Sequence, residues 1–248
     1  MIPKFVKVVV TTVTILLLSA CSTTSQSQDP RDPLESINRP IWTFNWDYAD
    51  KYVFKPVTEV YVDVVPTPVR NGVYNVALNL NEPFTAVNNV LQGKFQRAGV
   101  AVGRFVLNST VGLLGWFDVA KHADLLREEE EFGEVLGYYG VADGPYLMLP
   151  ALGPSSVRDE VGDFVDGYYW PLAIIDFWPN VARNLVIALE TRASLAEQEA
   201  LLNESLDPYE FVKNAYFQNI RYRLYDGNPP VEINEEQEQE LDELLEEF

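Results

Sequence analysis

The apolar positions of residues 33–53 recur at helical spacing and predict an amphipathic helix. Asp32-Pro33 followed by Glu35 is typical of a helix start. Two adjoining stripes result, Ile41, Phe44, Tyr48 and Tyr52 beside Trp42, Trp46, Ala49 and Val53, with Thr43, Asp47, Asp50 and Lys51 on the opposite side. The apolar arc is wider than on a typical surface helix. It fits burial in protein and a position among lipid headgroups equally well, so both interpretations stay open.

The same periodicity predicts helices over residues 84–116, 181–202 and 208–223. Prolines and a glycine break residues 61–83 into short helices and turns. Asn108-Ser109-Thr110, with glycines soon after, predicts a helix end. Gly99 and Gly103 have the spacing that lets helices approach closely. The pattern therefore predicts a mostly α-helical fold, and no internal repeat is seen.

Residues 132–154 differ, because glycines punctuate an aromatic-rich stretch. Such spacing favours loops or a short hairpin over one long helix. The preceding segment, 121–131, is highly charged and is expected to be exposed. No mature segment is apolar for the 18 or so residues that a membrane-spanning helix needs.

The N-terminus has the pattern of an export signal. Lys4 and Lys7 precede an apolar run over residues 8–18, which Leu18-Ser19-Ala20-Cys21 closes. That ending resembles a lipobox, so Cys21, the single cysteine, is the predicted lipidation site, and Ser22 after it resembles an outer-membrane sorting signal. Two or more acyl chains anchor a protein stably. The alternative is an ordinary secretory signal with a chance cysteine near the cut.

Charge divides the chain further. There are 18 basic and 37 acidic residues, and nine of the acidic ones lie in residues 231–248 without a basic partner. Nucleic acid is a poor partner for such a chain, because phosphate binding needs a basic patch. The expected parts are a signal peptide (1–20), a lipidated flexible tether (21–31), a helical domain (32–226) and an acidic tail (227–248). The tail is expected to be solvated, although its leucines recur at helical spacing and leave a docking helix open.

The sequence carries few of the residue patterns that enzyme chemistry uses. His122 is the only histidine and lies in a polar stretch, so no nucleophile–base set and no zinc set of nitrogen and sulfur ligands is predicted. No phosphate-binding glycine loop is found. The sequence therefore predicts a protein that is not an enzyme and that uses neither metal nor cofactor.

Short motifs in a fixed order resemble the MlaA (VacJ) family of phospholipid-transport lipoproteins over residues 30 to 225. The matching pieces are Asp32-Pro33-Leu34-Glu35, Asn38-Arg39, Asn79-Leu80-Asn81-Glu82-Pro83, Asn88-Asn89, Leu91-Gln92-Gly93, Arg104-Phe105, Asn108, Phe132-Gly133, Gly137, Gly140-Val141, Gly144-Pro145-Tyr146, Leu149-Pro150, Gly153, Arg158-Asp159, Asp207-Pro208-Tyr209 and Tyr216. Any one piece is weak evidence, but the ordered set is specific. The acidic tail lies outside the resemblance.

The resemblance implies a ring of amphipathic helices in one leaflet of the outer membrane, on its periplasmic face. A central channel would pass phospholipids from the outer leaflet to a periplasmic carrier that feeds an inner-membrane ABC transporter, beside a porin trimer. The alternative is an adaptor lipoprotein that docks carrier and porin without moving lipid.

The resemblance also assigns roles to particular residues. The motif residues Asn38, Arg39, Arg104, Arg158 and Asp207 are expected to be structural. On this interpretation the residues that face the membrane are Ile41, Trp42, Phe44 and Trp46, and the polar Asn45 among them must face protein or channel. The channel or its gate would contain Gly140, Gly144, Pro145, Tyr146 and Gly153. A mobile gate and a rigid structural turn are both compatible with that glycine-rich stretch.

Overall fold

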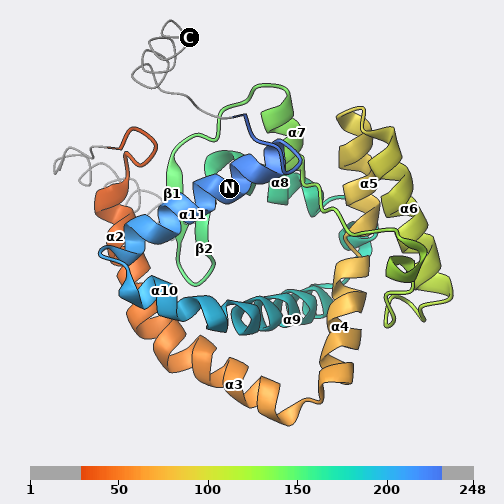
Figure 1. The fold of residues 1–248 in the computed structure, drawn as a ribbon, viewed down its shortest axis with the longest axis horizontal. Coiled ribbons are helices and arrows are strands. Elements are labelled where there is room, and N and C mark those ends of the chain that lie inside the picture. The colour runs from red at the N-terminus through yellow and green to blue at the C-terminus, as the bar shows by residue number, and fades with distance from the viewer. Residues whose placement is uncertain (1–28, 231–248) are drawn as a thin grey trace, which may run out of the picture.

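The first helices form one long path. The computed structural model describes residues 29–230, beginning with α2 (Glu35–Thr43), the π-helix η2 (Phe44–Phe54) and α3 (Lys55–Val64). After a turn at Pro66, α4 (Thr67–Asn79) runs back toward the body of the molecule (Figure 1). The predicted first helix is confirmed, but the helical path continues well beyond residue 53.

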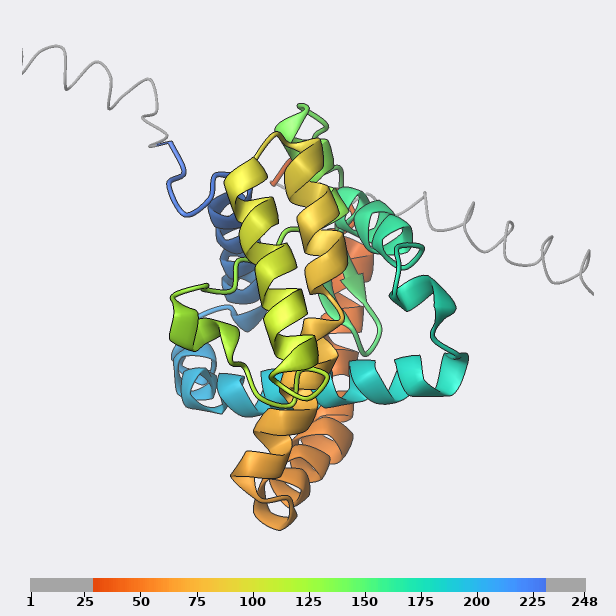
Figure 2. The same cartoon turned by 90° about the vertical axis from the view of Figure 1, so that its right-hand side faces the viewer.

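Two helices lie side by side at the edge of the molecule, α5 (Glu82–Leu91) and α6 (Phe95–Thr110) (Figure 2). The predicted helix end at Thr110 is confirmed, and the one-turn 3-10 helix η3 (Ala120–Ala123) follows. Gly99 and Gly103 were expected to let another helix approach closely, and for Gly99 this prediction is wrong. A Cβ at Gly99 would meet no neighbouring atom, so that glycine is not there for helix packing.

The glycine-rich stretch contains the predicted hairpin. A short helix, α7 (Phe132–Tyr138), leads to β1 (Tyr146–Leu149), which pairs antiparallel with β2 (Gly153–Ser156). Ser156 then caps α8 (Val157–Asp166) by accepting a hydrogen bond from the backbone of Asp159. The 3-10 helix η4 (Leu172–Ile174) lies in the connection that follows.

The last helices close the fold. They are α9 (Phe177–Ser194), the 3-10 helix η5 (Leu195–Gln198), α10 (Glu199–Glu204) and α11 (Pro208–Leu224). Asp207 caps α11 by accepting from the backbone of Tyr209 and Glu210. Because α9 packs against both α3 and α4 and leads back to α10 and α11, the helices follow a ring (Figure 1). Among residues 29–230, no helix is both long and apolar enough to cross a membrane.

A small aromatic core joins the hairpin to α11. It consists of buried Tyr146, Met148, Tyr209, Phe217 and Ile220. Ile41, Trp42 and Tyr216 pack against this cluster. The core therefore fastens the start of the chain, the hairpin and the last helix to one another.

Two polar residues that the pattern placed in solvent are buried. Asp50, expected on the exposed face of the first helix, is 8% exposed, since a π-helix has more residues per turn than an α-helix and shifts the faces. Glu130 is also buried and accepts a hydrogen bond from Gln92, although most of residues 121–131 are exposed as predicted. In both cases a partner from another element compensates the buried carboxylate.

Candidate functional site

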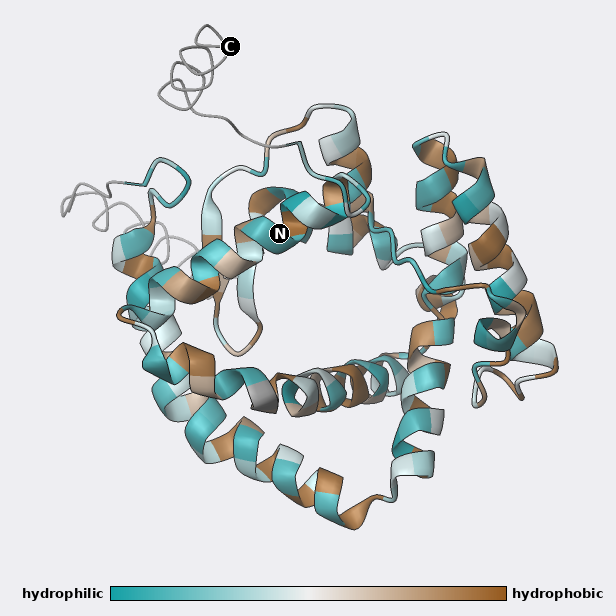
Figure 3. Cartoon of the chain, in the orientation of Figure 1, coloured by the Kyte–Doolittle hydropathy of each residue, from teal (hydrophilic) through white to brown (hydrophobic). Residues whose placement is uncertain are grey.

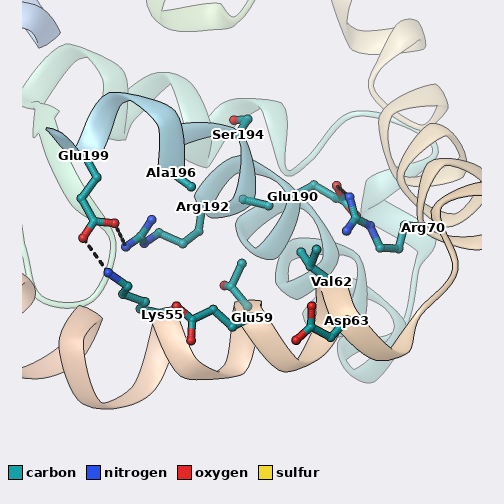
Figure 4. Close-up of a pocket in the computed structure, with 12 residues that line it drawn as sticks. Lys55, Glu59, Val62, Asp63, Arg70, Glu190, Arg192, Ser194, Ala196 and Glu199 are labelled. Atoms are coloured by element: carbon teal, nitrogen blue, oxygen red, sulfur yellow. Dashed lines mark hydrogen bonds and ion pairs between the residues drawn. The ribbon is translucent and has the colours of Figure 1, made fainter. Parts of the chain in front are cut away.

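A charged pocket of about 520 Å³ lies where α3 and α4 face the end of α9, η5 and the start of α10 (Figure 4). Pockets of this size accept small-molecule ligands. It is lined by Lys55, Thr58, Glu59, Val62, Asp63, Arg70, Glu190, Arg192, Ala193, Ser194, Ala196 and Glu199. The two sets of residues are more than a hundred positions apart in sequence, so the pocket exists only because the ring closes.

One end of the pocket is an ion-pair chain. Lys55 Nζ lies 2.7 Å from Glu199 Oε1, and Arg192 Nη2 lies 3.0 Å from Glu199 Oε2. Arg192 also forms an ion pair with Asp50 of η2, with 2.6 Å between Arg192 Nε and Asp50 Oδ1. The hydrogen bond from Lys55 is the main cause that lowers the pKa of Glu199. Both cations are thus held in place by carboxylates of neighbouring elements.

At the other end, Arg70 of α4 pairs with Glu190 of α9, with 3.1 Å between Arg70 Nε and Glu190 Oε1. Tyr61 donates a hydrogen bond to the same oxygen at 2.8 Å, and the Arg70 guanidinium lies 5.6 Å from the Tyr61 ring centre. Burial, followed by the contact with Glu190, raises the pKa of Tyr61 to about 12. The cation at this end, Arg70, is therefore half-buried, and the carboxylate of Glu190 already compensates its charge.

Two carboxylates between these ends are not matched. Glu59 and Asp63 are exposed, lie one turn apart on α3, and have no ion pair or hydrogen bond within residues 29–230. Beside them the Thr58 side chain is buried, and its hydroxyl has no hydrogen-bond partner in the described part of the chain. Like charges at this spacing destabilise a helix slightly. The pocket thus has two carboxylates without an ion pair or hydrogen bond in the described residues, next to a buried hydroxyl without a hydrogen-bond partner.

Of the valines of α3, Val62 lines the pocket and three others do not. Val57, Val60 and Val64 of α3 are exposed. Figure 3 shows hydrophobic and hydrophilic segments alternating along this helix. One side of α3 thus contributes charge to the pocket, while Val57, Val60 and Val64 are exposed outside its lining.

Three of the predicted motif residues meet where α2, the hairpin and α11 join. Asn38 donates to Asp32 and to the carbonyl of Tyr146, and accepts from the backbone of Met148. Arg39 forms ion pairs with Glu35, Asp207 and Glu210. This joint fastens α2 to the hairpin and to the start of α11.

The other two predicted arginines are buried at separate places. Arg104 pairs with Glu82 at 2.7 Å and with Asp118 at 3.1 Å. Arg158 pairs with Asp143 and donates to the carbonyl of Val141, which ties α8 to the loop after α7. Neither arginine lines the charged pocket.

The residues predicted for a channel or gate do not line the charged pocket either. Gly140, Gly144 and Gly153 have positive φ angles of 86°, 73° and 98° and shape the turns of the hairpin region. Pro145 is exposed beside them. Tyr146 is instead the centre of the core, with 0% exposure, so it lines no channel surface in this structure, and its part in a gate stays a prediction.

Asn45 faces protein, as its place in the apolar arc predicted. Its side chain donates to the carbonyl of Leu149 at 2.8 Å and accepts from the backbone of Ala151 at 2.7 Å. Together with Asn38 it attaches the hairpin to the first helical path. The turn beyond, including Leu152, remains exposed.

The predicted membrane-facing residues divide into two groups. Phe44 is exposed, but Ile41 and Trp42 are half-buried against the core, and Trp46 stacks on Trp42 with ring centres 5.7 Å apart. A second apolar surface lies over the end of α8 and the connection to α9. Its exposed members are Phe164, Tyr168, Trp170, Ile174, Phe177 and Trp178. The aromatic composition of residues 168–179 was visible in the sequence, but its exposure was not.

The pocket was not predicted from the sequence. Its residues belong to no motif, and the only local signal is a pair of acids on the valine-rich helix α3. His122 lies exposed in η3, away from the pocket. Cys21 and residues 231–248 lie outside the described residues. No cluster of metal-ligating side chains occurs in residues 29–230.

Comparison with known proteins agrees with the motifs. The family model described as MlaA lipoprotein matches residues 30–223. The chain is 41% identical over 208 residues to the intermembrane phospholipid transport system lipoprotein MlaA of Escherichia coli, covering 83% of each chain. It is 32% identical over 244 residues to the protein of the same name in Haemophilus influenzae, covering 94% of each.

A solved structure described as "Structural basis for maintenance of bacterial outer membrane lipid asymmetry" has a similar fold. The TM-score is 0.75 with 43% identity, over 78% of this chain and 98% of the other. Both the ordered motifs and the arrangement of helices thus agree with these relatives. This chain belongs to the MlaA lipoprotein family.

Proposed function

We propose that this protein moves phospholipids that have strayed into the outer leaflet of the outer membrane to a carrier in the periplasm. The observation that carries the proposal is the charged pocket on a helix whose valines are exposed. A lipid headgroup loses its hydration when it crosses hydrocarbon, which is costly for charged groups. Matched ion pairs inside a ring of helices would replace part of that hydration.

The acyl chains would remain outside the ring. Exposed Phe44 and the exposed aromatic residues between α8 and α9 suit the boundary between headgroups and hydrocarbon, where aromatic rings are enriched. Large exposed apolar patches often mark contacts with membranes or partners. Acyl chains on Cys21 would keep the ring in the inner leaflet of the outer membrane, beside a porin trimer.

The function is transport and not catalysis on this proposal. His122, the only histidine, is exposed and does not line the pocket. The relatives are named as components of a phospholipid transport system. Lipid would therefore pass through chemically unchanged, and the periplasmic carrier would deliver it to an inner-membrane ABC transporter.

Deletion of the protein in its own bacterium tests the proposal. Phospholipid on the outer surface of intact cells is labelled with and without the protein. Surface label should rise on deletion and fall again when the chain is supplied, but not when it is supplied as Cys21→Ser. An unchanged surface label, or a fall on deletion, would contradict removal from the outer leaflet.

The adaptor alternative predicts the same rise, so a second experiment separates the two. A small diazirine amino acid at position 62, where Val62 lines the pocket, is activated in the full-length protein in phospholipid vesicles. A translocating protein gives lipid adducts at this position. An adaptor that never admits lipid gives none, although adducts form from a diazirine at the exposed position Trp178.

A further inference from the structure

The charge of the pocket is not evenly compensated. Lys55, Arg70 and Arg192 each have a carboxylate partner within hydrogen-bonding reach, namely Glu199, Glu190 and Asp50. Glu59 and Asp63 line the same pocket with no ion pair or hydrogen bond in residues 29–230. The hydrogen bond to Glu199 is the main cause that raises the pKa of Lys55, and the charge of Glu59 also contributes to this raised pKa. The charge left for a ligand is therefore negative, although cations stand at both ends.

We propose that this pocket selects headgroups that carry a primary ammonium beside their phosphate, of the phosphoethanolamine type, over purely anionic headgroups. The ammonium would bind between Glu59 and Asp63, which can accept its hydrogen bonds. The phosphate would lie toward Lys55, whose side chain is 42% exposed and has donors to spare beyond Glu199. The proposal rests on the proposed function, because it names the lipid that this site admits.

The buried hydroxyl of Thr58 supports a ligand at this position. A buried polar group without a partner costs free energy, and proteins rarely leave one. Thr58 Oγ1 has no partner in the described residues, yet Thr58 lines the pocket between Lys55 and Glu59 in sequence. A phosphate or glycerol oxygen of the lipid would satisfy it after a small movement of the neighbouring side chains, because the hydroxyl oxygen is buried in this structure.

An anionic headgroup such as phosphoglycerol fits less well. It brings a phosphate but no cation, so Glu59 and Asp63 would repel it without any compensating contact. A quaternary choline brings the cation but no N–H donor, and it would lose the hydrogen bonds to the two carboxylates. The order expected is therefore ethanolamine first, then choline, then glycerol.

The full-length protein with the diazirine at position 62 tests this in vesicles of equal parts phosphatidylethanolamine and phosphatidylglycerol. Mass spectrometry of the adducts gives their ratio. Because exposed charge contacts contribute modestly, the ethanolamine lipid should be enriched about two- to fivefold. Glu59→Gln with Asp63→Asn should return the ratio to about one. The matched control, Asp47→Asn with Glu204→Gln, removes two exposed acids outside the pocket and should keep the enrichment.

The outcomes separate the two proposals. Adducts in the ratio of the vesicle, or enriched in phosphatidylglycerol, overturn the headgroup preference and leave transport intact. Enrichment that survives the loss of Glu59 and Asp63 overturns their role in it. No adduct of any lipid at position 62 overturns entry of lipid into this pocket, and with it the proposed function of the site.

Discussion

Arg192 of α9 holds Asp50 of the π-helix η2 through two parallel hydrogen bonds, from Nε at 2.6 Å and Nη2 at 2.8 Å. The contact joins residues 142 positions apart and lies directly beside the charged pocket. A bidentate pair of this kind fixes orientation as well as distance. It therefore sets how the late helix α9 meets the first helical path.

Removing Arg192 should destabilise the protein, because Asp50 would remain buried without its partner. Both side chains retain some exposure, at 15% and 12%, so the loss is expected at about 1–3 kcal/mol for Arg192→Ala. Urea unfolding measures it. The double variant Asp50→Asn with Arg192→Met should lose less free energy of unfolding than Arg192→Ala alone. Equal or larger losses in the double variant would show that the pair itself is the stabilising contribution.

Arg104 is the most deeply buried arginine of the described chain, and its planar fork reaches three partners. It pairs with Glu82 and Asp118 and donates to the carbonyl of Leu125. Lysine cannot reproduce this fork, so Arg104→Lys should cost about 2–4 kcal/mol in the free energy of unfolding. The same change at Arg97, whose side chain is 33% exposed, should cost under about 1 kcal/mol. Similar losses at both positions would contradict the importance of the fork.

The stability of the protein should depend on Asp166 between about pH 4 and pH 6. Burial is the main cause that raises its pKa to about 6 from an ordinary 3.8, although Asn88 and the backbone of Phe132 donate to it. A carboxyl with a raised pKa stabilises the folded state at low pH, and this contribution is lost as the pH rises through 6.

Unfolding curves at several pH values measure this effect. Asp166→Asn should remove a decline of about 1–3 kcal/mol between pH 4 and pH 6.5 that the wild type shows. Asp47→Asn, which changes an exposed carboxylate, should leave the decline in place. If the wild type instead gains stability relative to Asp166→Asn as the pH rises over this range, the prediction is wrong.

The hairpin turn is expected to loosen in Asn45→Ala. This change removes the contacts to the carbonyl of Leu149 and to the backbone N–H of Ala151. Amide exchange at Leu149, Ala151 and Leu152 should accelerate about three- to tenfold, since a single hydrogen bond contributes about 0.5–1.5 kcal/mol. Exchange at Met148 should stay slow, because Asn38 still holds it.

Whether the turn acts as a gate is a separate question. A disulfide engineered between this turn and η2 should block lipid transport if residues 140–153 must move. Unchanged transport in the locked protein would favour the rigid structural turn. Reduction of the disulfide serves as the internal control.

His122→Ala should leave lipid transport unchanged. It should also leave the free energy of unfolding within about 0.5 kcal/mol of the wild type. The residue is exposed in η3 and has no contact with the pocket. The surface-label assay and urea unfolding measure the two properties. A loss of transport with unchanged folding would reopen the possibility of an active site around His122.

Local patterns predicted much of the fold. The end of α6 at Thr110 follows from polar and glycine residues, and the start of α11 at Asp207 follows from a capping residue before proline. Glycine spacing predicted loops or a short hairpin, and the structure has the hairpin. These features depend on the conformations that a few adjacent residues can adopt.

The pocket depends on long-range packing and was not predicted. Nothing in the sequence beside Asp50 shows that Arg192 will meet it, and apolar periodicity does not distinguish an α-helix from the π-helix η2. Tyr146 was expected in a channel or gate because a tyrosine among glycines resembles a loop residue, whereas in the structure it lies on β1 and is buried in the core. Tertiary contacts decided each of these positions.

The pocket is divided between an early and a late part of the chain, and this has a consequence for folding. Lys55, Glu59, Asp63 and Arg70 precede Glu190, Arg192 and Glu199 by more than a hundred positions. A chain that ends before α9 therefore has the acids of α3 but no opposite wall. The pocket forms only after the late helices have packed against α3 and α4.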